Sequence, residues 1–186
     1  SDLQAFNDNK MEYVLVCTDI ETGEAVYKSF YTYSYEMCEY IRASASMPIA
    51  ARIVEIDGRK MLDGGITDSI PLRQFQQMGY EKNIVVTTQP AAYRKAHNRL
   101  MPLFRMTLSQ YPKLLTALDT RHEMYNCQLD YLFEQEQGEN TLVIRPPEAL
   151  NIGHICHDEA VMERVYEVGR REATKRMNEI KTFLAK

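Results

Sequence analysis

Several features are missing from this sequence of 186 residues. It contains no tryptophan, and no apolar run approaches the roughly 20 residues that a membrane-spanning helix requires. Its lysines and arginines are scattered and the formal net charge is −4. A basic stripe that could neutralise the phosphates of a nucleic acid is therefore absent from the sequence. We expect no nucleic-acid partner.

Cysteine is also sparse. The four cysteines, Cys17, Cys38, Cys127 and Cys156, stand far apart and form no C-x-x-C pair. Disulfide frameworks and zinc ribbons depend on paired spacings, so this distribution favours reduced thiols. Reduced thiols indicate a reducing compartment, and we expect a cytoplasmic protein.

The composition is ordinary for a globular protein, with 45% apolar and 26% charged residues. The length suits one sizeable domain, and neither an internal repeat nor a low-complexity linker interrupts it. We therefore predict a single α/β domain over residues 1–186. In this domain a sheet region (1–90) is followed by a mainly helical region (91–186) with one short strand.

Hydrophobic patterns place the elements of the first region. The valine-rich run Met11–Thr18 predicts a buried strand, and Ala25–Phe30 is expected to pair back onto it. Tyr35–Ala45 has helical spacing. An Asp-Gly pair, Asp57-Gly58, predicts a tight hairpin between the runs 52–56 and 60–62.

The rest of the chain alternates helices and strands. A helix is expected to be capped near Asp68 or Ser69, to have Pro71 in its first turn and to end near Met78. A buried parallel strand over 83–88 follows, and then two or three helices within 91–136 that Pro102 and Pro112 interrupt. A strand over 141–145 and one long final helix, which begins at about 157–159, complete the chain. This alternation predicts α/β architecture.

Asp63-Gly64-Gly65 is the most informative motif. It follows the predicted hairpin, so Asp63 is expected at the end of a strand, where α/β sheets place their chemistry. Glycines allow sharp turns and close approach of backbones. We therefore expect Gly64 and Gly65 to bring the chain close to a neighbouring segment, for which a turn that carries a nucleophilic serine is the candidate.

The surroundings of this motif resemble those of a known family. A-S-A-S-M-P (43–48), a strand, an Asp-Gly turn, a strand, D-G-G-I (63–66) and S-I-P-L (69–72) follow in the order found around the catalytic aspartate of patatin-like phospholipases. The preceding T-D-I-E-T-G-E-A-V-Y (18–27) extends the resemblance. Later stretches resemble a bacterial subgroup of the same family and are interpreted as scaffold. They are Tyr111-Pro112, Arg121, Tyr125-Asn126 and Y-E-V-G-R-R-E-A (166–173).

The resemblance implies a patatin-like three-layer α/β/α sandwich and a function. It implies a lipid acyl hydrolase, acting on phospholipids or other carboxylic esters through an acyl-enzyme, in which Asp63 is the base of a Ser-Asp dyad and Gly64 and Gly65 form the active-site loop. No cofactor and no metal belong to this chemistry. The substrate would bring the protein into peripheral contact with membranes.

The family's nucleophile is missing from these residues. The sequence has no G-x-S-x-G elbow, and Gly64-Gly65 is its only adjacent glycine pair. The family places the elbow before the D-G-G motif, and this chain begins at Ser1 without a methionine. We therefore expect the carboxy-terminal part of a longer enzyme, inactive by itself. Such a part of a sheet would expose an unpaired edge, through which we expect a homodimer.

Two other functions remain open. Ser44 or Ser46 could be the nucleophile of a self-contained esterase, although no histidine or glycine-rich turn flanks them to activate a hydroxyl. The chain could also be a non-catalytic α/β module that binds a partner or a lipid surface. Separately, Tyr27, Tyr31, Tyr33 and Tyr35 recur every second or fourth residue and are expected on one face of an extended segment, either as a packed strand face or as an aromatic lip that contacts acyl chains.

The histidines give weak signals. His154, Cys156 and His157 have donor atoms that bind zinc or copper, but their spacing differs from that of paired zinc ligands. The acidic residues after His157 fit the start of a helix better. His97 and His122 lie among charged residues, and we expect both on helix surfaces.

Overall fold

The structure is a computed structural model that describes residues 2–153 and 155–185. It divides into two compact units. The first unit comprises the chain up to Ile70 together with Lys95–Gln128, and the second comprises Pro71–Arg94 together with the chain from Leu129 onward. The prediction of a single domain over residues 1–186 stays a prediction.

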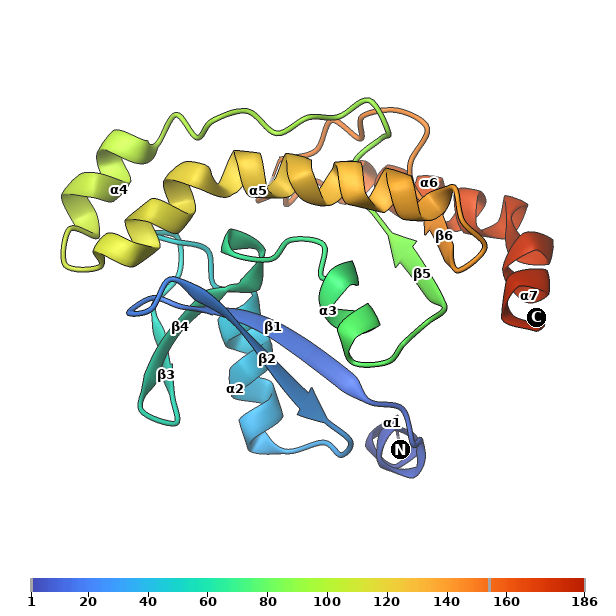
Figure 1. Cartoon of the computed structure of the whole chain (residues 1–186), viewed down its shortest axis with the longest axis horizontal. Helices are drawn as coiled ribbons and strands as arrows, with labels where there is room; N and C mark the ends of the chain where they lie inside the picture. The colour runs from blue at the N-terminus through green and yellow to red at the C-terminus, as the bar shows by residue number, and fades with distance from the viewer. Residues whose placement is uncertain (1, 154, 186) are drawn as a thin grey trace. The chain divides into compact units, whose positions relative to one another are not determined.

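The elements of the first unit are α1 (Asp2–Asp8), β1 (Tyr13–Asp19), β2 (Glu24–Phe30), α2 (Tyr35–Ser44), β3 (Val54–Ile56), β4 (Arg59–Asp63), the short 3-10 helix η1 (Gly64–Ile66) and α4 (Met101–Thr107) (Figure 1). Those of the second unit are α3 (Leu72–Gln77), β5 (Asn83–Val86), β6 (Thr141–Ile144), α6 (Glu159–Lys175) and α7 (Met177–Ala185). Helix α5 (Pro112–Glu136) begins in the first unit and ends in the second.

The first unit is built on a four-stranded antiparallel sheet in the order β2-β1-β4-β3. The predicted hairpin between β3 and β4 is confirmed, and both residues of its Asp57-Gly58 turn have positive φ (54° and 72°), as tight hairpin turns require. β1 pairs with β2 along its full length but with β4 only from Cys17↔Asp63 to Asp19↔Met61. Asp63 therefore lies beside the middle of β1.

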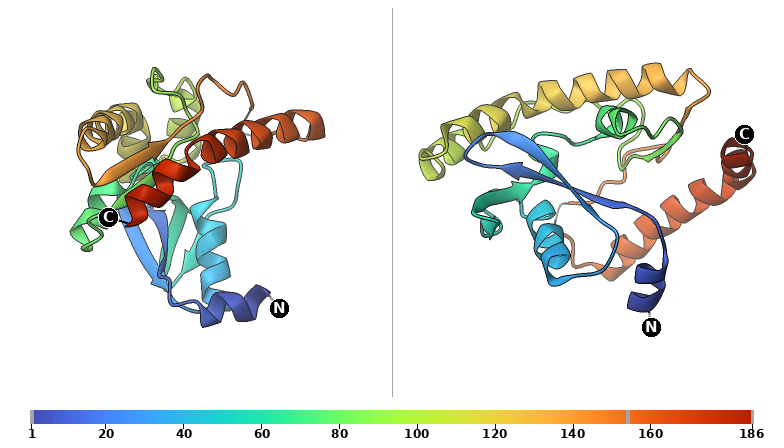
Figure 2. Two further views of the ribbon diagram at one scale, coloured as in Figure 1. Left: turned by 90° about the vertical axis from the view of Figure 1, so that its right-hand side faces the viewer. Right: turned by 60° about the horizontal axis from the view of Figure 1, so that its bottom comes forward.

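Helix α2 covers one face of this sheet (Figure 2). It begins where predicted, because the Ser34 hydroxyl accepts a hydrogen bond from the Met37 backbone N–H at 3.1 Å. Alternate strand residues point toward the helix and are buried. This core consists of Leu15, Cys17, Phe30, Met37, Tyr40, Ala43, Val54, Ile56 and Met61.

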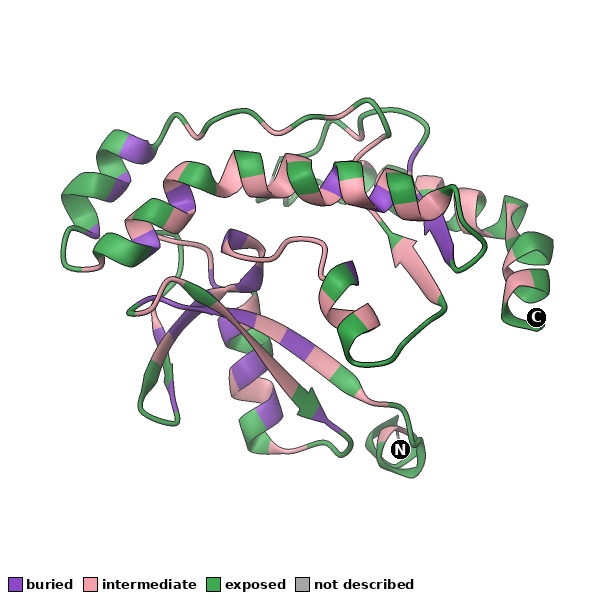
Figure 3. Cartoon of the chain, viewed as in Figure 1, coloured by how far each residue is buried: buried purple, intermediate pink, exposed green. Residues whose placement is uncertain are grey.

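Helices α4 and α5 supply the second core, on the opposite face. Met61 belongs to the core under α2, whereas its neighbour Leu62 belongs to this one, as the alternation of a strand requires. The buried members are Ile20, Leu62, Ile66, Met101, Phe104, Leu108, Leu114 and Leu118, and Figure 3 shows their segments in purple. The first unit thus has a sheet between two helical layers, and the predicted α/β fold class is confirmed.

The second unit contains the parallel pair β5-β6, with Asn83 opposite Thr141. Parallel pairing was expected for the strand over 83–88. The two strands differ in how deeply they are buried. All four residues of β6 are buried, whereas Val86 on β5 is 70% exposed. The predicted strand therefore forms over Asn83–Val86, but the prediction that it is buried is wrong, since its residues are partly or largely exposed.

Three helix boundaries also differ from expectation. Pro102 and Pro112 lie in the first turns of α4 and α5, so these prolines start helices instead of interrupting them, and residues 91–100 are not helical. The N-cap position of α3 is Pro71, without a side-chain hydrogen bond. Asp68 and Ser69 do not cap it because their side chains bond elsewhere, as described below.

The final helix is broken into α6 and α7 at Arg176, where one long helix was predicted. At the break, the Arg176 guanidinium donates two hydrogen bonds of 2.7 Å to Glu179 and a third to the Val143 carbonyl of β6. These bonds hold the chain where the helix direction changes. None of the described residues of α6 and α7 is buried, so the apolar stripe of this region is not covered within the second unit.

The tyrosine series does not form one strand face. β2 ends at Phe30, and Tyr31, Tyr33 and Tyr35 beyond it are exposed. Tyr27 is partly buried within β2 and donates a hydrogen bond to Asp68. The expected common face is therefore wrong, because the strand is shorter than the series.

Gly64 marks the closest backbone approach in the first unit. A Cβ atom on Gly64 would lie 2.2 Å from the Val16 carbonyl oxygen of β1, a distance at which a side chain cannot fit. A close approach at Gly64 was expected, but its neighbour is strand β1 of this chain and not a turn that carries a serine. Only glycine therefore allows η1 to pack directly against β1.

We predict that Gly64→Ala destabilises the protein by about 3 kcal/mol or more, since the methyl group meets fixed backbone and forces the strand and loop apart. Urea unfolding followed by far-UV circular dichroism measures this loss. Gly169→Ala is the matched control. Nothing lies within 4 Å of its added methyl, and alanine in helix α6 should stabilise by up to about 1 kcal/mol. Equal midpoints for Gly64→Ala and the parent would contradict the packing.

The four cysteines are free thiols, as expected, but they differ in reactivity. Burial, and secondarily the Asp63 charge, raises the pKa of the Cys17 thiol to about 12. Because the thiolate is the reactive form, Cys17 should not react with iodoacetamide at pH 8 in the native protein, while exposed Cys127 should. Mass spectrometry of labelled peptides measures both. Native labelling of Cys17 at the rate of Cys127 would show that this core opens.

Candidate active site

The backbone of Asp63 is fixed on both sides. Asp63 is the last residue of β4, as predicted. Its N–H donates to the Ser46 carbonyl at 2.9 Å, and its own carbonyl accepts a hydrogen bond of 2.8 Å from the Thr18 hydroxyl of β1. Thr18 is fully buried. The side chain of Asp63 therefore starts from a rigid position at the edge of the core.

The carboxylate of Asp63 is anchored through one oxygen. Its Oδ1 accepts a hydrogen bond of 2.7 Å from the Gly65 N–H, so Asp63 caps the short helix η1. Among the described residues, Oδ2 accepts no hydrogen bond and Asp63 has no ion pair. Asp63 is only partly buried. One oxygen thus fixes the carboxylate while the other is open to a hydroxyl donor.

The carbonyl of Gly65 holds the other side of this turn. It accepts hydrogen bonds from the Arg121 Nε at 2.6 Å and from the Ser69 hydroxyl at 2.7 Å. Arg121 lies on α5, far along the chain. Gly65 is therefore held at its N–H by Asp63 and at its carbonyl by Arg121 and Ser69.

Asp68 and Gln128 hold the end of the same segment, which we call the Asp63 loop (residues 63–70). Gln128 of α5 donates to the Asp68 carboxylate at 2.6 Å, and its own side-chain oxygen accepts from the N–H groups of Ser69 (3.1 Å) and Ile70 (2.9 Å). Tyr27 donates to the other oxygen of Asp68. Burial first, and the bond and charge of Asp68 next, raise the pKa of Tyr27, so this hydroxyl stays a donor.

The structure brings Asp63, Gly64 and Gly65 together but not the candidate serines. Ser46 is buried, and its hydroxyl donates to the Arg42 carbonyl at 2.7 Å. Ser46 contacts Asp63 through its backbone carbonyl alone, so its hydroxyl is not directed at a base. Ser44 is the last residue of α2, and no hydrogen bond joins its side chain to Asp63 among the described residues.

Arg121 and Gln128 were not recognised as site residues from the sequence. Arg121 was interpreted as scaffold, and Gln128 carried no motif. The available signal was their spacing, since positions seven apart on a helix share one face. That spacing alone could not show which loop the face contacts.

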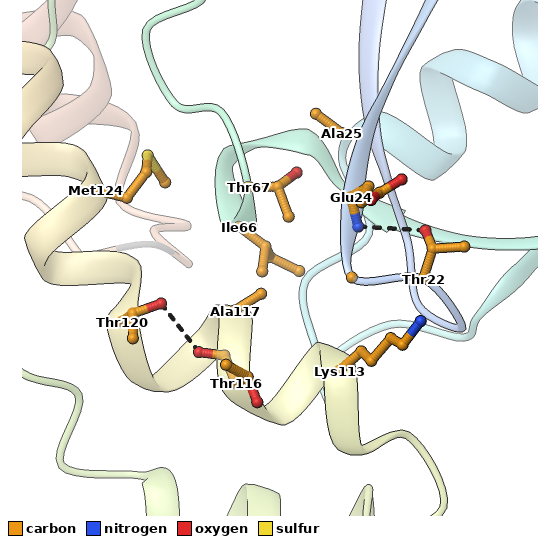
Figure 4. A pocket seen from close by; sticks show the side chains of 11 residues that line it. Thr22, Glu24, Ala25, Ile66, Thr67, Lys113, Thr116, Ala117, Thr120 and Met124 are labelled. Atoms are coloured by element: carbon orange, nitrogen blue, oxygen red, sulfur yellow. Dashed lines mark hydrogen bonds between the residues drawn. The ribbon is translucent and has the colours of Figure 1, made fainter.

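A pocket of about 500 Å³ opens beside η1 (Figure 4). It lies between the β1–β2 turn, η1 and α5, and its walls include Thr22, Glu24, Ile66, Lys113 and Thr120. Asp63 is not among its lining residues. Residues of the Asp63 loop, Ile66 and Thr67, therefore form part of the pocket wall, but the Asp63 carboxylate does not line it.

Among the described residues, no histidine forms a hydrogen bond or an ion pair with Asp63. His97 is exposed, but it lies in the non-helical segment 91–100 and not on the expected helix surface; its Nε2 lies 2.8 Å from Asp119, and partly buried His122 of α5 lies beside it. His154 of the weighed metal cluster lies outside the described residues. Within residues 2–153 and 155–185, no group of three or more His, Cys, Asp or Glu is arranged to hold a metal ion. Over the same residues, no helix combines the length and apolarity needed to cross a membrane.

Comparisons with known protein families match two segments of the chain. Residues 8–75, which include the Asp63 loop, match the model of the patatin-like phospholipase family, a family of lipid hydrolases. Residues 111–185 match a domain of unknown function, DUF6363. No curated protein matches the chain. The match over residues 8–75 is consistent with a member of the patatin-like phospholipase family.

Proposed function

We propose that these residues supply the aspartate half of a Ser-Asp dyad in a lipid acyl hydrolase. Asp63 is the general base, Gly64 and Gly65 shape the active-site loop, and the serine lies on a segment outside the 186 residues. One observation carries the proposal. The Asp63 carboxylate is anchored by Oδ1 on Gly65, while Oδ2 is left for a donor, at a strand end inside the patatin-matching segment.

The chemistry follows from this geometry. The serine oxygen attacks the ester carbonyl carbon as its proton passes to Asp63, and backbone donors stabilise the oxyanion. Collapse of this intermediate expels the alcohol, which takes the proton from Asp63, and leaves an acyl-enzyme. Water then attacks the acyl-enzyme with Asp63 again as base, which releases the acid and the serine.

Asp63 is a weak base for this task. A free aspartate has a pKa of about 3.9, far below that of a serine hydroxyl. Proton transfer must therefore accompany carbon–oxygen bond formation, and the oxyanion hole must supply much of the rate enhancement. A fixed carboxylate orientation matters more here than high basicity, which agrees with the hydrogen bonds around Gly65.

We propose phospholipids or other carboxylic esters as substrates, with peripheral membrane contact and a cytoplasmic location. The 186 residues alone are proposed to be inactive, because they carry no G-x-S-x-G serine. Among the described residues, the outer strands β2 and β3 each pair on one side only. Upstream strands of the complete enzyme would pair with such an edge, and a second copy would pair with it in the isolated chain.

Asp63→Asn in the complete enzyme is expected to lower the rate of hydrolysis by roughly 10³-fold or more, by analogy with lesions in serine triads. Asparagine still accepts the Gly65 hydrogen bond but cannot take a proton, so the loop should keep its structure. Release of fatty acid from phospholipid vesicles and hydrolysis of a short activated ester measure the effect.

The matched control is Asp57→Asn in the exposed hairpin turn, where asparagine tolerates positive φ and activity should not change. Activity of Asp63→Asn within about tenfold of the parent would remove Asp63 as the base. A complete protein that hydrolyses no ester at all would support the non-catalytic lipid- or partner-binding module instead.

A further inference from the structure

We infer that Arg121 and Gln128 of α5 are positioning residues that hold the Asp63 loop in its catalytic conformation. The inference rests on the proposed function and extends it. Both residues lie within 111–185, the segment that matches a domain of unknown function, while the loop lies within the patatin-matching segment. The first part of that domain therefore has a role in the hydrolase site itself.

Arg121 acts on the start of the loop. Its Nε donates to the Gly65 carbonyl at 2.6 Å, and no carboxylate among the described residues lies within 4.0 Å of its guanidinium. A hydrogen bond from a charged donor is stronger than one between neutral groups, particularly where the donor is partly buried. Because the N–H of Gly65 bonds Asp63, Arg121 fixes the residue that orients the carboxylate.

Gln128 acts on the end of the loop. Its side chain makes three hydrogen bonds, one to Asp68 and two from the N–H groups of Ser69 and Ile70. These N–H groups precede α3, whose N-cap residue Pro71 provides no side-chain hydrogen bond. The two residues are seven positions apart on one helix, so they present one face of α5 to both ends of the loop.

The loop needs this support. After Asp63, the last residue of β4, the loop has no regular structure except the three residues of η1, and it includes two adjacent glycines. Loss of the Arg121 bond would leave the Gly65 carbonyl dependent on Ser69, which belongs to the same loop. The Asp63 carboxylate could then turn away from the serine, and a displacement of about 1 Å can cost about 10²-fold in rate.

The test uses the complete enzyme with Arg121→Met and Gln128→Met. We expect kcat to fall by about 10²-fold for Arg121→Met, with KM nearly unchanged, because a misplaced base weakens the chemical step and not substrate binding. Arg121→Lys, which keeps a charged donor, should recover part of the loss. Arg105→Met is the control, since Arg105 is an exposed arginine that pairs with Asp119.

A second measurement separates positioning from other roles. Amide hydrogen exchange in residues 64–70 should accelerate in both methionine variants, while exchange in α2 should not change. Unchanged exchange in the loop, or unchanged kcat in an active enzyme, would overturn the inference. If the parent enzyme hydrolyses no ester, the proposed function fails, and loop exchange alone still decides whether α5 holds the loop.

Discussion

The hydrogen bond from the Gly65 N–H to the Asp63 carboxylate is the interaction on which the site depends. It sets the direction of the only side chain in this chain to which we assign chemistry, and it leaves Oδ2 open. Two further features of the loop support this bond directly. Because residue 64 is glycine, η1 can pack directly against the Val16 backbone of β1. The Arg121 side chain donates a hydrogen bond to the Gly65 carbonyl and so fixes Gly65 from its other side.

The sheet supplies the fixed base for this loop. Met61 and Leu62 point into cores on opposite faces, so β4 cannot shift toward either helical layer without opening one of them. Asp63 is the next residue of this strand, and backbone hydrogen bonds with the Thr18 hydroxyl and the Ser46 carbonyl hold it further in place. A rigid strand fixes the position of the carboxylate, and the turn that follows it, which side chains of α5 hold in place, fixes the orientation.

Local patterns predicted much of this arrangement, and long-range contacts explain what they missed. The valine-rich strand, the Asp57-Gly58 hairpin, the Ser34-capped helix and the position of Asp63 each depend on a few adjacent residues. Arg121 and Gln128 reach the loop across 56 to 60 residues of sequence, so no local pattern could assign them. The helix break at Arg176 was missed for the same reason, because its partner Val143 lies on a distant strand.

The central claim is that Asp63 completes a dyad with a serine outside these residues. The most direct measurement is a structure of the complete enzyme, with the serine identified by reaction with a fluorophosphonate. The account predicts that the serine of the unreacted enzyme places its hydroxyl oxygen about 2.6–3.2 Å from Oδ2 of Asp63, with Oδ1 still on Gly65. A labelled serine remote from Asp63, or a label on Ser44 or Ser46, would contradict it.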